Sequence, residues 1–116
     1  MSKGFLKVAE ELYELGKRSR GEKREFAFRS AISRAYYGVL WYIRDFYNLR
    51  ESEDLRVITY KALKKRNLSQ IIEDLKELSQ ARIQADYRKK RLKITIDEIT
   101  TNYYIKLALK IINSLE

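Results

Sequence analysis

The absence of proline is the feature that most constrains the fold of this chain. Its 116 residues contain no Pro and only four Gly. Proline and glycine supply most tight turns, and a protein built of β-strands needs many of them. The sequence therefore favours long helices joined by short connections. We expect a single domain over residues 1–116, because the chain is too short for two independent cores.

Apolar residues recur at three- and four-residue spacing along most of the chain, which predicts amphipathic helices. We expect five of them, over residues 3–17, 22–48, 53–66, 69–88 and from about 95 to the end of the chain. The first should end at Gly16, Ser52 is a candidate N-cap of the third, and Thr95 to Glu98 forms a candidate capping box for the last. The predicted fold class is all-α, an up-and-down four-helix bundle with an additional shorter helix.

The segment 22–48 is apolar around most of its circumference. A seam at spacings of four and three comprises Ile32, Tyr36, Val39, Ile43 and Phe46, and beside it lie Tyr37, Leu40, Trp41 and Tyr42. A helix at the surface of a small bundle keeps a polar face, so this helix should be covered on both sides. A second copy of the chain would provide that cover, which predicts a homodimer. The alternative is a central helix wrapped by the other four.

Two arginines occupy seam positions that predict burial. The seam of residues 69–88 comprises Ile71, Leu75, Leu78, Arg82 and Ala85. Arg29 lies three residues before Ile32 on the seam of residues 22–48, and Ser33 directly follows Ile32. A buried guanidinium needs a carboxylate, a polar cleft or a ligand. Asp86, four residues after Arg82, predicts an internal ion pair, and a ligand site is the alternative.

The net charge of +9 is clustered along the sequence. Three groups, within residues 17–24, 61–66 and 88–93, hold 14 of the 25 basic residues. Clustering favours a phosphate-rich partner. The residues that we expect to bind it, as RNA-binding residues if the family resemblance given below holds, are Arg29, Ser33, Arg34, Arg88, Lys89, Lys90 and Arg91. The alternative is that the cations keep the surface soluble, and a composition rich in Lys, Glu and Ile also suits a thermophile.

Histidine and cysteine are both absent. This excludes disulfides, thiolate metal sites, a cysteine nucleophile and the usual acid–base residue at neutral pH. We therefore expect no metal and no cofactor, and any chemistry must use Arg, Lys, Tyr, Ser, Asp or Glu. No signal peptide opens the sequence and no apolar run reaches the ~18 residues of a membrane span, so a cytoplasmic protein without membrane contact is expected.

Two motifs resemble those of HEPN domains. The segment from Arg29 to Gly38, which reads Arg-Ser-Ala-Ile-Ser-Arg-Ala-Tyr-Tyr-Gly, resembles their second-helix signature Ser-Arg-Ala-Tyr-Tyr-Ala. The segment from Arg82 to Tyr87 is similar to the Arg-x-x-Ala-Asp-Tyr of a prokaryotic HEPN subgroup. The motifs stand in the expected order, and the resemblance covers essentially the whole chain. It implies a four- to five-helix bundle that dimerises.

The resemblance also implies an RNA-directed function. Many HEPN proteins are metal-independent ribonucleases, often the toxin of a toxin–antitoxin pair with a minimal nucleotidyltransferase as partner. Both protomers contribute to one cleft through an Arg followed, after four to six residues, by His. Here Arg82 matches the Arg, and Tyr87 stands where His is expected, so Arg82, Asp86 and Tyr87 are the catalytic candidates. The alternative is a catalytically inactive module that binds RNA, a nucleotide or a nucleotidyltransferase.

Overall fold

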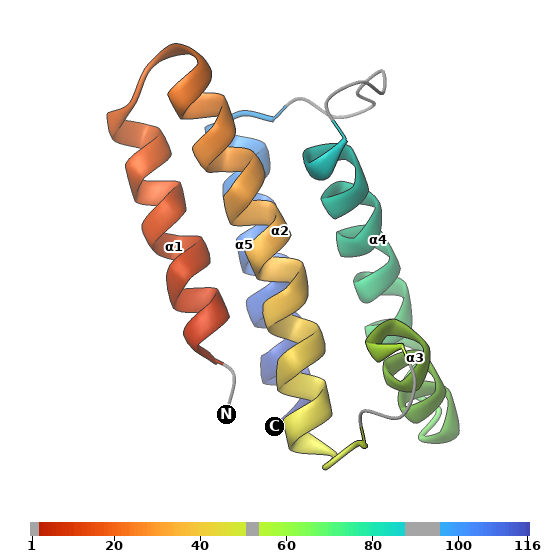
Figure 1. Ribbon diagram of the computed structural model, residues 1–116. Coiled ribbons are helices and arrows are strands. Elements are labelled where there is room, and N and C mark those ends of the chain that lie inside the picture. Colours follow the sequence, from red (N-terminus) through yellow and green to blue (C-terminus); the bar gives the residue numbers. More distant parts are fainter. Residues whose placement is uncertain (1–2, 51–53, 88–95) are drawn as a thin grey trace.

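The described part of the chain is entirely helical and irregular, without strands. The computed structural model describes residues 3–50, 54–87 and 96–116. Its helices are α1 (Lys3–Arg18), α2 (Gly21–Phe46), α3 (Leu55–Lys65), α4 (Ser69–Asp86) and α5 (Glu98–Leu115) (Figure 1). The prediction of an all-α chain is confirmed. None of the helices in these ranges combines the length and the apolar composition that crossing a bilayer requires.

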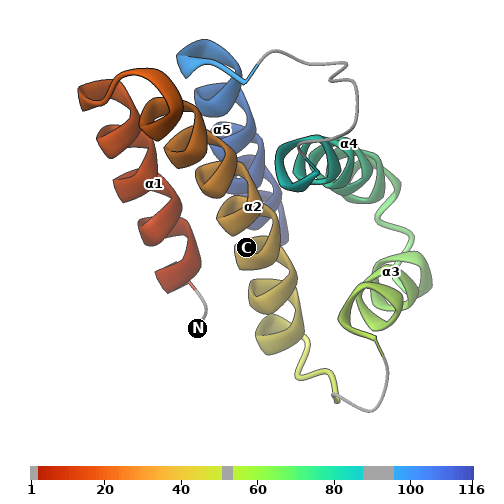
Figure 2. The ribbon, with the colours of Figure 1, turned by 45° about the horizontal axis from the view of Figure 1, so that its top comes forward.

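Helix α2 lies at the centre of the bundle and contacts all four of the other helices. Figure 1 shows α1 on one side of it, α4 on the other and α5 behind it, and Figure 2 shows the short helix α3 next to α4. On the α1 side, the ring of Trp41 stacks on Phe5 at a centroid distance of 6.1 Å. The other four helices thus pack around α2, as in the alternative of a central helix. The homodimer stays a prediction.

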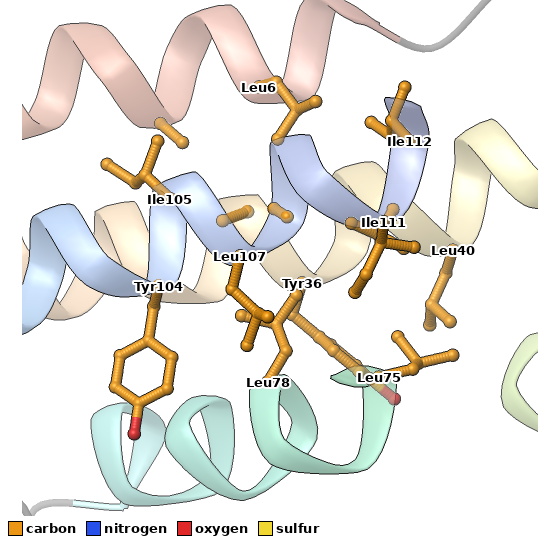
Figure 3. Packing of buried hydrophobic residues seen from close by; sticks show 14 of the residues in the cluster. Leu6, Tyr36, Leu40, Leu75, Leu78, Tyr104, Ile105, Leu107, Ile111 and Ile112 are labelled. Atoms are coloured by element: carbon orange, nitrogen blue, oxygen red, sulfur yellow. The ribbon is translucent and has the colours of Figure 1, made fainter. Parts of the chain in front are cut away.

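The predicted seams form the core. On α2, Ile32, Tyr36, Val39 and Ile43 are fully buried, while Phe46 is 38% exposed and ends the seam. On α4, the apolar residues Ile71, Leu75 and Leu78 are buried as expected. Figure 3 shows Tyr36 reaching from α2 to α4, with its hydroxyl end near Leu75. The two helices therefore interlock along the seams that their sequences predict.

Two aspartates cap helices, at positions other than those predicted. Asp54 accepts a hydrogen bond from the backbone N–H of Arg56 at 2.8 Å, and Asp97 accepts one from Thr100 at 2.8 Å. These backbone hydrogen bonds lower the pKa of both carboxyls. The predicted caps Ser52 and Thr95 lie outside the described residues, and the capping box was wrong by two positions because α5 begins only after Asp97. At the start of each helix, more than one neighbouring residue has a side chain that could cap it. The residue that does so is the one directly before the first helical residue, Asp54 for α3 and Asp97 for α5.

Glycines mark the places where α1 and α2 approach closely. Helix α1 ends at Arg18, one residue beyond the predicted range 3–17, so Gly16 lies inside its last turn rather than terminating it. A Cβ atom at Gly16 would lie 2.5 Å from the ring of Phe28, so this glycine makes room for a buried aromatic side chain. A Cβ atom at Gly38 would lie 2.9 Å from the Cβ of Phe5. Both glycines are needed for packing rather than for turning the chain.

We predict that Gly38→Ala lowers the free energy of unfolding by about 1 kcal/mol. Alanine is the better helix former by about 1 kcal/mol, but displacing α1 from its close contact should cost about 1–3 kcal/mol. Gly4→Ala is the matched control, because nothing lies within 4 Å of its added methyl group and the change should be neutral or stabilising. Urea denaturation measures both variants. A Gly38→Ala protein as stabilised as the control would contradict the close approach.

Candidate functional site

A groove with a volume of about 610 Å³ runs between α1, α2 and α4. It is lined by Val8, Leu12, Phe26, Arg29, Ser30, Ser33, Arg34, Tyr37, Ala85 and Asp86. We call it the Arg34 groove. The structure thus brings together four residues predicted from the sequence to belong to a site, namely Arg29, Ser33, Arg34 and Asp86. They come from the two motifs, which lie more than 40 residues apart in the sequence.

One face of α2 supplies most of the groove. Phe26, Ser30 and Arg34 follow each other at four-residue spacing, and Tyr37 continues the same face three residues later. The side chain of Phe26 is 62% exposed, and Arg34 is exposed as well. Phe26 and Ser30 were not among the predicted site residues. They lie eight and four residues before Arg34 on the same helical face, and this spacing is the signal that could have found them.

Arg29 is buried, with only 6% of its surface exposed, and its guanidinium has partners on two helices. Its Nε and Nη2 atoms lie 2.9 and 2.8 Å from Oε1 of Glu25. Its Nη1 atom donates to the backbone carbonyls of Gln84 at 3.1 Å and Ala85 at 3.0 Å. The guanidinium is therefore engaged within the chain, and its predicted contact with RNA stays a prediction.

This arrangement satisfies the C-terminal end of α4. The last carbonyls of a helix lack partners within the helix, and they carry partial negative charge. Helix α4 has no basic residue in its own last turn. Arg29 of α2 provides both the hydrogen-bond donor and the positive charge from outside. The end of α4 is thereby held against α2, which fixes the position of Asp86 at the groove.

Arg82 is buried next to the same helix end, and it forms the predicted ion pair. Its Nη1 atom lies 3.4 Å from Oδ2 of Asp86, and 7% of the residue is exposed. Its Cζ atom lies 5.3 Å from the ring centroid of Tyr36 and 5.7 Å from that of Tyr37, within the range of cation–π attraction. Its Nε atom is buried and has no hydrogen-bond partner among the described residues. Unlike Asp86, Arg82 does not line the groove.

An acid and a phenol stand at the end of α4. Oδ2 of Asp86 also accepts a long hydrogen bond of 3.5 Å from Oγ of Ser33 on α2. Tyr87 follows as the C-cap residue and is 51% exposed. The predicted RNA-binding residues Arg88, Lys89, Lys90 and Arg91 lie outside the described residues. Within the ranges that the structure describes, no group of three or more acidic side chains could hold a metal ion.

Comparison of the sequence with protein-family models gives no match, and comparisons with curated proteins and with solved structures give none either.

We predict that Arg29→Met lowers the free energy of unfolding by about 2–4 kcal/mol. The variant keeps the apolar stem of the side chain, but two carbonyls at the end of α4 lose their charged donor, and such donors are worth about 1.5–3 kcal/mol each. Arg34→Met is the matched control, because Arg34 is exposed and its loss should change stability by less than about 0.5 kcal/mol. Urea denaturation of both variants tests this difference. Equal stabilities would show that Arg29 does not hold α4.

Proposed function

We propose that this chain is an RNA-directed helical protein and that the Arg34 groove binds single-stranded RNA. One observation carries the proposal. The groove places the exposed ring of Phe26 and the exposed guanidinium of Arg34 on the same face of α2, eight residues apart. Arg34 has no hydrogen bond or ion pair with any other described residue, so its charge is available to a phosphate.

Each component of the groove matches a part of an RNA strand. An exposed aromatic ring is a surface on which a base can stack, and an arginine binds the phosphate that follows. The hydroxyls of Ser30 and Ser33 lie between these two groups along the helix and can bond to phosphate or to a ribose 2′-hydroxyl. The net charge of +9 attracts a polyanion to the protein.

The groove suits an unpaired strand better than a duplex. Stacking on Phe26 requires a base that is free of its own neighbours, and bases are accessible in this way in single strands, loops and bulges. In addition, Asp86 lies on one wall of the groove and would repel a dense array of phosphates. Its charge is offset locally by Arg82, at 3.4 Å. A strand with its bases turned towards α2 avoids this carboxylate.

The resemblance of two segments to HEPN motifs supports a more specific proposal. The first, from Arg29 to Gly38, contributes the middle of the groove, and the second, from Arg82 to Tyr87, contributes its far edge. We therefore propose a HEPN-like fold and a homodimer acting as the HEPN component of a prokaryotic toxin–antitoxin system. A minimal nucleotidyltransferase is the partner that this resemblance implies.

RNA cleavage without metal is the second function that we propose, and the succession of Asp86 and Tyr87 at the end of α4 favours it. In this scheme the Asp86 carboxylate takes the proton of a ribose 2′-hydroxyl, whose oxygen attacks the adjacent phosphorus. The P–O5′ bond breaks, and the leaving 5′-oxygen receives a proton from the phenol of Tyr87, so that a 2′,3′-cyclic phosphate forms. Arg82, buried behind Asp86, would act as a positioning residue that orients the carboxylate.

For binding, we predict that Phe26→Ala weakens the affinity for a single-stranded RNA by about 5- to 100-fold, because stacking on an aromatic side chain is worth about 1–3 kcal/mol per base. Arg34→Gln should weaken it by about 5-fold or more and reduce the salt dependence by about one phosphate contact. Fluorescence anisotropy with a labelled 12-nucleotide RNA measures both effects.

Matched controls separate the groove from general charge and apolar surface. Ile99→Ala removes another large exposed apolar side chain, and Arg50→Gln removes another exposed arginine, and neither residue lines the groove. Both controls should bind RNA within about 2-fold of the wild-type protein, a difference of about 0.4 kcal/mol. If the controls lose as much affinity as the groove variants, RNA does not bind in the groove.

For cleavage, we predict that Asp86→Asn and Tyr87→Phe each slow the reaction in EDTA by about 100-fold or more, since each removes one proton-transfer group. RNA affinity should change little, which separates chemistry from binding. The measurement is single-turnover cleavage of a labelled RNA, with the 2′,3′-cyclic phosphate identified by mass. Cleavage by both variants at the wild-type rate would exclude this mechanism and leave RNA binding as the function.

A further inference from the structure

A second pocket lies where the short helix α3 packs against α2 and α4. It has a volume of about 450 Å³ and is lined by Tyr36, Arg56, Val57, Tyr60, Lys61, Lys64 and Ser79. We call it the α3 pocket. Its volume falls in the range of about 300–1,000 Å³ that is usual for small-molecule sites. The α3 pocket and the Arg34 groove have no lining residue in common. Tyr36 lies between them, because it lines the pocket and its ring faces Arg82, the ion-pair partner of Asp86 in the groove.

The spacing of residues on α3 explains why one pocket collects them. Arg56, Tyr60 and Lys64 follow each other at four-residue spacing, so their side chains lie on one face of the helix. Val57 and Lys61 continue that face one residue later in each turn. The face turns towards α2 and α4, which adds Tyr36 and Ser79 to the pocket.

A buried hydroxyl without a partner lies at this pocket. Tyr36 is fully buried, and its hydroxyl makes no hydrogen bond of good geometry among the described residues; the nearby Ser79 side chain, which also lines the pocket, lowers the pKa of the phenol less than burial raises it. Burial raises the pKa of this phenol, so at neutral pH it carries a proton that it can donate. Buried polar groups are nearly always hydrogen-bonded, and one that is not points to a missing partner. A polar atom of a bound molecule would supply it.

The remaining lining residues define what kind of molecule fits. Arg56, Lys61 and Lys64 stand at the pocket; Arg56 is paired with the carboxylate of Asp54 at 3.5 Å, and no carboxylate lines the pocket itself. Between the cations lie the apolar surfaces of Val57 and of the Tyr60 ring. Burial also raises the pKa of Tyr60, to about 12, which keeps this second phenol a neutral hydrogen-bond donor. The ligand must therefore combine an apolar body with an anionic group.

We infer that the α3 pocket binds a small amphipathic organic anion, with its apolar body between Val57 and Tyr60, its anionic group at Lys64, and a polar atom bonded to the Tyr36 hydroxyl. Carboxylates and phosphate monoesters share this chemistry. The inference does not depend on RNA binding in the Arg34 groove.

Fluorescence titration with two probes, 2-naphthoate and 2-naphthyl phosphate, tests the inference and distinguishes the two anion types. Whichever of the two probes binds more tightly should have an affinity at least about 10-fold higher than that of 2-naphthol, which lacks the charge. Its affinity should exceed that of inorganic phosphate, which lacks the apolar body, by the same factor. If neither probe binds, or if 2-naphthol or inorganic phosphate binds equally well, the inference is wrong.

Variants locate the bound probe. Lys64→Ala should weaken binding by about 5-fold or more through loss of a charged contact, whereas Lys65→Ala, the neighbouring exposed lysine that does not line the pocket, should stay within about 2-fold. Tyr36→Phe should weaken binding by about 3- to 10-fold without lowering the melting temperature, because it removes an unpaired buried hydroxyl. Equal losses for Lys64→Ala and Lys65→Ala would indicate diffuse attraction to a basic surface and overturn the assignment.

Discussion

The position of α4 depends on one buried guanidinium. Arg29 extends from α2, pairs with Glu25 on its own helix and donates to two carbonyls at the end of α4. Burying a charge without partners is costly, and here the partners are a carboxylate and the negative end of a helix. The same contact determines where the chain leaves α4, and therefore where Asp86 and Tyr87 stand. Arg29, which the sequence suggests for ligand binding, thus links α2 to the C-terminal end of α4.

The second buried arginine shapes the chemistry of the groove differently. Arg82 lies behind Asp86 and faces the rings of Tyr36 and Tyr37, so its charge is shared between an acid and two aromatic surfaces. A phosphate in the groove would meet Asp86 before it met Arg82. This order favours a role for Arg82 in holding the carboxylate, and it leaves Arg34 as the exposed cation of the groove. The geometry therefore supports the proposal of RNA binding more directly than the proposal of cleavage.

Local spacing made part of this structure predictable. The three- and four-residue seams identified the buried faces of α2 and α4, the burial of Arg82 and its ion pair with Asp86, because all of these are relations along a single helix. The partners of Arg29 on α4 could not be predicted in this way, since they lie 55 and 56 residues further along the chain. The α3 pocket was missed for the same reason. The cap of the last helix was misplaced because neighbouring residues offered equivalent chemistry.

Tyr36 gives the molecule a property that neither site has alone. One side of its ring faces the guanidinium of Arg82, and its hydroxyl end belongs to the α3 pocket. Arg82 in turn pairs with the carboxylate on the wall of the Arg34 groove. A displacement of this tyrosine would therefore alter the α3 pocket and, through Arg82, the surroundings of the Asp86 carboxylate. If both proposed sites bind their ligands, thermodynamic linkage requires any resulting effect of one ligand on the other to be equal in both directions.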